Sequence, residues 1–169
     1  MTGSPGSVLP RTWRFDAIGT AWQIDTTVPL ASDARAAVRD VIETFDREWS
    51  RFRADSIVTA LAGGESTAAA PPDAAAMLDA YVELDRATSG AVNPLVGASL
   101  AARGYDADYA LVDRGAHPAP QDWRARLTWT AETLSLTEPA LIDVGALGKG
   151  RLVDRVLSAL APFAVGDIV

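Results

Sequence analysis

The chain has no cysteine and a single histidine, His117, and these shortages exclude several kinds of chemistry. Without cysteine there is no disulfide, no thiolate metal ligand and no cysteine nucleophile. One histidine cannot build a histidine-rich metal site. A Ser-His-Asp arrangement would depend on His117 alone, and the sequence has no G-x-S-x-G turn to present a serine.

Long apolar runs and an excess of basic residues are missing as well. No apolar stretch approaches the roughly 18 residues that a membrane-spanning helix needs. The 15 Lys and Arg residues are outnumbered by 22 Asp and Glu, and the formal net charge of −7 argues against a nucleic-acid partner. The first residues lack the basic and apolar parts of a secretory signal, so we expect a cytoplasmic protein.

What is present is an ordinary globular composition, 49% hydrophobic and 22% charged, over 169 residues, a length that suits about one domain. Gly, Ser and Pro in residues 1–10 predict a flexible tail, so the folded domain is expected over residues 11–169. The pattern of apolar residues predicts mixed helices and mainly antiparallel strands, which is an α+β fold.

Several segments have a helix or strand pattern. Residues 13–27 are expected to be extended, as two strands or one long bent strand, with Gly19 at a bulge or a close approach. Helical spacing predicts one helix after Ser32 and another after Pro72. Period-two alternation predicts a hairpin within residues 127–137.

The most informative segment is the glycine-rich run Asp143-Val-Gly-Ala-Leu-Gly-Lys-Gly-Arg151. The apolar residues 140–142 before it read as a buried strand, and the apolar residues after it have helical spacing. A strand, a glycine-rich turn and a helix in this order direct backbone N–H groups and the positive end of a helix dipole toward one point. Lys149 adds a positive charge there and Asp143 a carboxylate, so we predict an anion-binding site.

Two familiar phosphate-binding patterns do not fit this run. The phosphate loop of nucleotide hydrolases requires Gly where Asp143 stands and Ser or Thr where Gly150 stands. The dinucleotide pattern G-x-G-x-x-G fails too, because Gly145, Gly148 and Gly150 are spaced in the reverse order. A glycine-rich turn with a solvated lysine is therefore the alternative to an anion site.

Four segments nevertheless resemble, in the correct order, motifs of the ApbE family, the FAD:protein FMN transferases. The run from Asp143, with Asp154 after it, resembles the motif D-L/V-G-x-x-x-K-G-x-x-x-D. Three upstream segments resemble further motifs of the family: Phe15-Asp-Ala-Ile-Gly-Thr20, Phe45-Asp-Arg-Glu-Trp-Ser-Arg-Phe-Arg-Ala-Asp-Ser56 and Thr88-Ser-Gly-Ala-Val-Asn-Pro-Leu-Val-Gly97.

The resemblance implies a fold, a reaction and a partner. The fold is an ApbE-like (T-fold-like) α+β domain, of which residues 11–169 are expected to be the N-terminal part, truncated at the C-terminus. The reaction moves the FMN half of FAD to a Thr or Ser hydroxyl of an acceptor protein and releases AMP, with Mg²⁺ as the charge clamp on the phosphates. The catalytic base is expected beyond Val169, and an open sheet edge predicts self-association.

The resemblance also implies the site residues. Asp143 and Lys149 are expected to contact FAD, with Lys149 as a point charge on a phosphate, and the backbone carbonyl of Ala146 to reach the metal. Ile18, where the family usually has Met, is expected to pack near the cofactor. Phe52, where the family often has Tyr, is expected to stack on a ring. The alternatives are a turn cap for Asp143 and core packing for Ile18 and Phe52.

A further stretch, Ala91, Val92 and Asn93, matches residues that line the cofactor mainly with their backbone. Asn93 stands where the family usually has Asp, which replaces an acceptor-only carboxylate by a neutral amide. Ser56 is expected to cap a short helix rather than to contact a substrate. The basic cluster of Arg47, Arg51 and Arg53, interspersed with acidic residues, is expected to form a solvated face, and a contact with adenosine or with the acceptor protein is the alternative.

Three functions are open at this point. The complete protein transfers FMN to an acceptor protein, or the chain binds FAD without transferring anything, or water replaces the acceptor hydroxyl and FAD is hydrolysed to FMN and AMP. A further alternative is that the 169 residues in isolation do not bind FAD, because the expected site requires the second half of the family's domain.

Overall fold

The computed structural model describes residues 11–106, 110–163, 165 and 168. The tail expected over residues 1–10 lies outside these described residues. Among the residues that are described, no helix is both long and apolar enough to cross a membrane. The chain combines helices with strands that all pair antiparallel, so the predicted α+β class is confirmed.

The chain divides into two compact units. One unit comprises Met1–Thr44 and Leu152–Val169, and the other comprises Phe45–Arg151. The boundaries fall inside two helices, α1 (Ser32–Trp49) and α6 (Gly148–Leu160). Each of these helices therefore contributes residues to both units.

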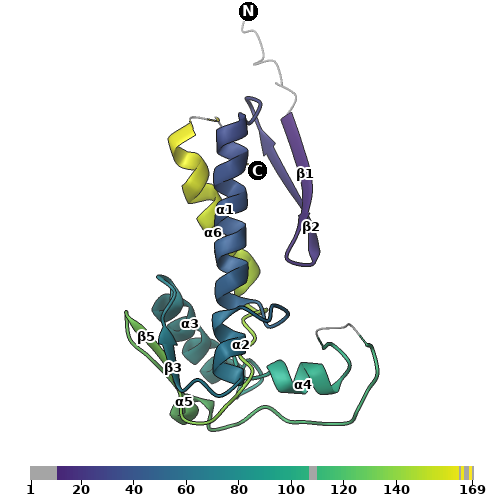
Figure 1. The fold of residues 1–169 in the computed structure, drawn as a ribbon, viewed down its shortest axis with the longest axis vertical. Helices are drawn as coiled ribbons and strands as arrows, with labels where there is room; N and C mark the ends of the chain where they lie inside the picture. The colour runs from purple at the N-terminus through teal and green to yellow at the C-terminus, as the bar shows by residue number, and fades with distance from the viewer. Residues whose placement is uncertain (1–10, 107–109, 164, 166–167, 169) are drawn as a thin grey trace, which may run out of the picture. The chain divides into compact units, whose positions relative to one another are not determined.

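In the first unit, β1 (Arg11–Ala17) and β2 (Thr20–Thr26) form an antiparallel hairpin (Figure 1). Ile18 and Gly19 close it, and both have positive φ angles, 46° and 71°. A two-residue loop of this kind is a type I′ turn, whose twist matches that of the flanking strands. The extended segment is thus two strands, and Gly19 is a turn residue rather than a bulge.

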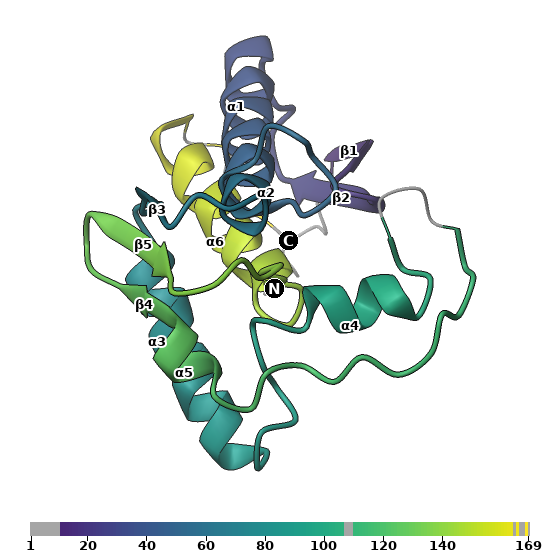
Figure 2. The same cartoon turned by 60° about the horizontal axis from the view of Figure 1, so that its bottom comes forward.

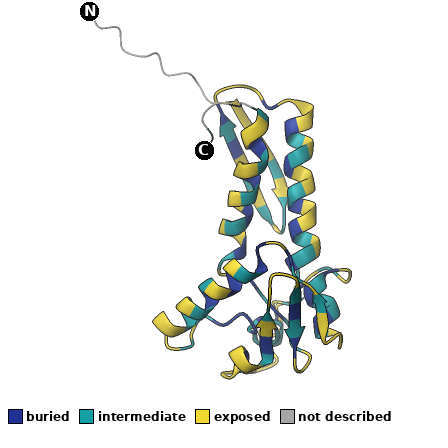
Figure 3. Ribbon diagram, turned by 90° about the vertical axis from the view of Figure 1, so that its left-hand side faces the viewer, coloured by how far each residue is buried: buried dark blue, intermediate teal, exposed yellow. Residues whose placement is uncertain are grey.

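Helix α1 has one buried face along its whole length. Ala34, Val38, Ile42, Phe45 and Trp49 recur at intervals of three or four residues and are buried (Figure 3). This spacing returns each side chain to the same side of a helix with 3.6 residues per turn. The helix predicted after Ser32 is therefore confirmed.

Helix α6 has a narrower buried face than its sequence suggests. Leu152, Val156 and Leu160 are buried, whereas Val153 and Leu157 are exposed. A short 3₁₀ turn, η1 (Ala161–Phe163), follows the helix.

The second unit combines short helices with a small sheet. The strands β3 (Thr67–Ala69), β5 (Thr133–Leu136) and β4 (Leu127–Trp129) pair antiparallel in that spatial order (Figure 2). The predicted hairpin is β4–β5. Strand β3 was not predicted, because its three small residues lack apolar alternation; besides its backbone pairing with β5, its Thr67 Oγ1 shares a hydrogen bond with Ser135 Oγ at 3.1 Å.

Four helices complete the second unit: α2 (Ile57–Ala62), α3 (Ala74–Ala87), α4 (Gly97–Ala102) and α5 (Trp123–Arg126). Ser56 caps α2, and its Oγ accepts a hydrogen bond from the Thr59 N–H at 3.1 Å, as predicted. Helix α3 is joined to the sheet by the hydrogen bond from Trp129 Nε1 to Asp79 Oδ1, at 3.1 Å.

Residues 140–142 do not form the predicted strand. The Leu141 carbonyl accepts a hydrogen bond from the Gly97 N–H at 3.2 Å, and the Asp143 N–H donates to the Pro94 carbonyl at 2.8 Å. The pairing stops there because proline has no N–H to donate and helix α4 begins at Gly97. These two bonds still bring the motif around residue 94 beside the glycine-rich run.

Gly97 is required by this pairing, which gives a first prediction. A Cβ atom at this position would lie 2.5 Å from the Leu141 carbonyl oxygen. We expect Gly97→Ala to lower the unfolding free energy by about 1–3 kcal/mol, because the backbone contact must open. Urea unfolding measures it, with Gly150→Ala as the matched control, since nothing lies within 4 Å of a Cβ there. Equal stability of the two variants would contradict the prediction.

Candidate functional site

The carboxylate of Asp143 organises the glycine-rich turn. Its Oδ1 accepts a hydrogen bond from the Gly145 N–H at 2.7 Å, and its Oδ2 accepts one from Arg51 Nε at 2.6 Å. The two charged side chains are only 15% and 3% exposed, respectively. Screening by water is weak at such a place, so their attraction is stronger than that of a surface pair. Asp143 therefore caps the turn and is fixed in one orientation.

Arg51 was expected on a solvated face, and this expectation is wrong. The acidic residues next to it in sequence suggested surface ion pairs. Arg53 does pair in this way with Asp46 and Asp55, at 3.3 and 2.9 Å. Arg51 instead turns inward to Asp143, 92 positions away. A buried cation needs a partner of this kind, because an isolated charge is costly to take out of water.

Tyr81 of α3 supports the same turn. It is buried, and its hydroxyl donates to the Asp143 carbonyl at 3.3 Å. Burial and then the Asp143 carboxylate raise the pKa of Tyr81, opposed in part by backbone hydrogen bonds from Ala146 and Leu147. The hydroxyl therefore keeps its proton at neutral pH and remains a donor to the turn. Sequence analysis gave no sign of this role, since Tyr81 lies in an apolar helical pattern.

The helix that follows the turn begins at Gly148, so Lys149 lies in its first turn and is exposed. Lys149 is also the only lysine among the 15 Lys and Arg residues of the chain. A cation near a helix N-terminus opposes the helix dipole, and a bound anion removes this conflict. Arg151 anchors the same end of the helix, because its Nε lies 2.9 Å from Oδ2 of the buried Asp73.

The three glycines of the run differ in what surrounds them. A Cβ at Gly145 would lie 2.8 Å from Asp143 Oδ1, and one at Gly148 would lie 3.0 Å from Val144 Cγ2. A side chain at either position would therefore press on a neighbouring side chain of the turn. A Cβ at Gly150 would meet nothing within 4 Å. Gly150 thus leaves open space beside Lys149, where a ligand can approach the helix backbone.

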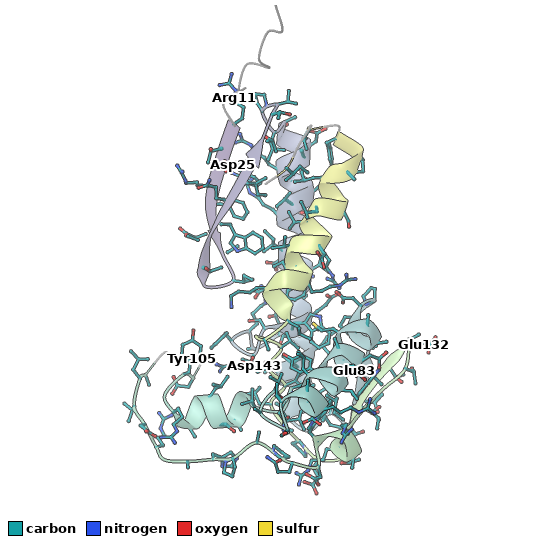
Figure 4. The ribbon with its side chains drawn as sticks, turned by 180° about the vertical axis from the view of Figure 1, so that it is seen from behind. Arg11, Asp25, Glu83, Tyr105, Glu132 and Asp143 are labelled. Atoms are coloured by element: carbon teal, nitrogen blue, oxygen red, sulfur yellow. The ribbon has the colours of Figure 1, made fainter. Side chains whose placement is uncertain are left out.

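An aromatic surface adjoins the ion pair. The Arg51 guanidinium carbon lies 4.1 Å from the centroid of the Phe52 ring and 5.4 Å from that of Tyr105. The two rings meet edge to face, with centroids 6.1 Å apart, and are 38% and 47% exposed. Asp143 lies where the loops of the second unit converge, with Tyr105 toward α4 (Figure 4). Tyr105 was not predicted, because a single aromatic residue in a polar segment has no periodic signal.

Asn93 uses its side chain for the fold. It is buried, its Nδ2 donates to the Pro120 carbonyl at 2.8 Å and its Oδ1 accepts from the Leu95 N–H at 2.8 Å. Ala91 and Val92 precede it in an exposed to half-buried stretch. The Asn93 side chain thus holds the local fold through one donated and one accepted hydrogen bond.

Ile18 belongs to the first unit, whereas all the other predicted site residues belong to the second. The structure thus brings Phe52, Asn93, Asp143 and Lys149 into one unit. Ile18 is half-buried in the hairpin turn and has a φ of 46°. This is an uncommon conformation for a β-branched residue and marks local backbone strain.

Oxygen donors suited to Mg²⁺ are few. Within the described ranges, no three His, Cys, Asp or Glu side chains are grouped so that they could hold a metal ion. The exposed turn residue Ala146 offers its backbone carbonyl, and the Asp143 carboxylate is already engaged by Arg51 and Gly145. If Mg²⁺ binds here, the Ala146 carbonyl would be its ligand from this turn, which suits an ion that takes few ligands from protein and the rest from phosphate and water.

The structure is an α+β domain in which a glycine-rich turn leads into a helix with an exposed lysine, Lys149, in its first turn. A model of the ApbE family matches residues 18–168, so the chain belongs to the ApbE family and the predicted resemblance is confirmed. No curated protein sequence matches the chain significantly.

Solved structures of ApbE proteins share the fold. The flavinyl transferase ApbE of Pseudomonas stutzeri, in its apo form, gives a TM-score of 0.74 at 16% identity, over 98% of this chain and 59% of that one. The flavin transferase ApbE of Vibrio cholerae gives 0.74 at 18% identity, over 95% and 56%. The ApbE protein of Thermotoga maritima gives 0.74 at 16% identity, over 95% and 56%. The chain thus spans 56–59% of the length of these three structures.

The strained hairpin turn gives a second prediction. Asn tolerates positive φ and forms type I′ turns readily when Gly follows it. We expect Ile18→Asn to raise the unfolding free energy by about 1 kcal/mol, because the strain is relieved. Thermal unfolding measures it, and Ile18→Val, which stays β-branched, serves as the control. A lower melting temperature for Ile18→Asn than for Ile18→Val would refute the assignment of strain.

Proposed function

We propose that the complete protein transfers the FMN moiety of FAD to a Thr or Ser hydroxyl of an acceptor protein, depends on Mg²⁺ and releases AMP. This chain supplies the N-terminal part of the FAD site. Membership of the ApbE family and the likeness to proteins named flavin transferases support the proposal. The observation that carries it is Lys149, in the first turn of α6, beside the open space at Gly150.

The residues of this chain bind and orient FAD. Lys149 and the backbone N–H groups at the start of α6 bind phosphate oxygens, as charged and uncharged donors respectively. Phe52 offers a ring face for stacking, and the backbone of residues 91–93 lines the site. Mg²⁺, held in part by the Ala146 carbonyl, neutralises charge on the phosphates. None of these residues is assigned as the base that takes the proton of the acceptor hydroxyl.

A third prediction tests the transfer and the role of Lys149 together. Full-length protein is mixed with FAD, Mg²⁺ and an acceptor protein, and covalent flavin is read as fluorescence after denaturing electrophoresis. We expect Lys149→Ala to reduce labelling at least about tenfold, because a charge-assisted contact to phosphate is lost. Lys149→Arg keeps the charge and should retain most of the labelling. Arg86→Ala removes an equal charge from an exposed ion pair with Glu83 and should change nothing.

The outcomes of this assay separate the alternatives. Undiminished labelling in Lys149→Ala rejects the assigned site. Release of AMP without labelled acceptor indicates hydrolysis of FAD, and retention of FAD without AMP indicates a binding protein. An amine-reactive probe followed by peptide mass spectrometry also shows directly whether FAD protects Lys149, the one lysine of residues 1–169.

A fourth prediction concerns Gly150, which the fold itself does not require. Glycine inside a helix is less stable than alanine by about 1 kcal/mol, so Gly150→Ala should raise the unfolding free energy by about 0.5–1 kcal/mol. It should also weaken FAD binding, because the new methyl group fills the space beside Lys149. Thermal unfolding and FAD titration measure the two effects. Ser158→Ala, on an exposed part of the same helix, is the control. Unchanged affinity in Gly150→Ala would show that no ligand approaches there.

A further inference from the structure

Arg51 is held in an environment that the turn alone does not explain. Its Nε is committed to Asp143, and its guanidinium plane lies against Phe52 and near Tyr105. The side chain is only 3% exposed. Its Nη2 atom is buried and has no hydrogen-bond partner among the described residues. A buried donor without a partner lowers the stability of the fold, particularly on a charged group. The environment of Arg51 therefore points to a role other than stability.

The position of Arg51 connects two parts of the proposed site. On one side, its Nε fixes Oδ2 of Asp143, which leaves Oδ1 to hold the Gly145 N–H. On the other side, its planar guanidinium packs on the ring of Phe52, a residue that is 38% exposed. Only arginine combines a directed ion pair with stacking on an aromatic face in this way. One side chain therefore sets both the polar turn and the neighbouring ring.

Charge gives Arg51 a second effect. The Asp143 carboxylate lies at the start of the turn that leads to the expected anion site, and an unpaired carboxylate there would oppose the binding of phosphate. The guanidinium, 2.6 Å away, neutralises that charge. The turn can then present Lys149 and backbone N–H groups to an anion without an opposing negative charge.

We propose that Arg51 is a positioning residue of the FAD site, which acts by fixing and neutralising Asp143 and by holding the ring of Phe52. This inference rests on the proposed function, since the ligand it concerns is FAD. It assigns Arg51 a role through Asp143 and Phe52 rather than a contact with the reacting atoms.

A double-mutant cycle in the full-length protein tests the inference. The dissociation constant for FAD is measured by flavin fluorescence for wild type, Arg51→Met, Asp143→Asn and the double variant. We expect Arg51→Met to raise the dissociation constant about tenfold in the wild-type background, as the loss of a charge-assisted pair does. In the Asp143→Asn background the same change should have a much smaller effect, because the carboxylate it acts on is gone.

Two further variants keep the test decisive. Arg51→Lys preserves the charge but not the stacking plane, and should recover part of the affinity; it replaces Arg51→Met in the cycle if that variant does not fold. Arg53→Met, the matched change at a neighbouring arginine that pairs with Asp46 and Asp55, should leave FAD binding unchanged. Circular dichroism with heating confirms that each variant is folded.

Each result supports or overturns the inference. An equal loss of affinity from Arg51→Met in both backgrounds shows that Arg51 does not act through Asp143 and overturns the inference. A lower melting temperature with unchanged affinity indicates a purely structural ion pair and overturns it too. If wild type binds FAD and only the Arg51 dependence is absent, the inference fails while the proposed function stands. If wild type does not bind FAD, both fail.

Discussion

The buried ion pair between Arg51 and Asp143 is the interaction on which the glycine-rich turn depends. It joins the end of helix α1 to a segment 92 positions later, at 2.6 Å and with little exposure to water. Removing either partner would leave the other charge buried and alone, which is among the more destabilising changes a protein can suffer. The turn, the start of α6 and the aromatic surface of Phe52 are all arranged around this pair, so local geometry there is set by a long-range contact.

Several features around the pair are unfavourable for the fold considered alone. Lys149 opposes the dipole of α6. Gly150 destabilises the same helix, although a larger residue would fit at this position. Arg51 has a buried N–H group without a hydrogen-bond partner among the described residues. Proteins retain such features chiefly where a ligand compensates for them. An anion at the start of α6 would relieve the first directly and give the second a purpose.

Sequence analysis was reliable where a local pattern decides the structure. The spacing in α1, the alternation in β4–β5 and the cap at Ser56 are local, and the structure contains each of them. It failed where distant contacts decide. Arg51 has acidic neighbours in sequence but forms its ion pair with Asp143. Residues 140–142 are apolar, but the segment beside them, between Pro94 and Gly97, is too short to pair with them as a strand. The motif around Lys149 was visible in sequence, whereas the support from Arg51, Tyr81 and Asp73 was not.

Asn93 shows how a departure from a family's usual residue can be read physically. Its amide donates to the Pro120 carbonyl and accepts from the Leu95 N–H, two opposite roles that one carboxylate cannot fill. An Asp here would face the Pro120 carbonyl without a proton to share. The choice of Asn therefore fixes the loop that carries residues 91–93 and removes a negative charge from the neighbourhood of Asp143. In this chain the site is left with one carboxylate in the turn, already neutralised by Arg51, so Lys149 meets an anionic ligand with little local opposition.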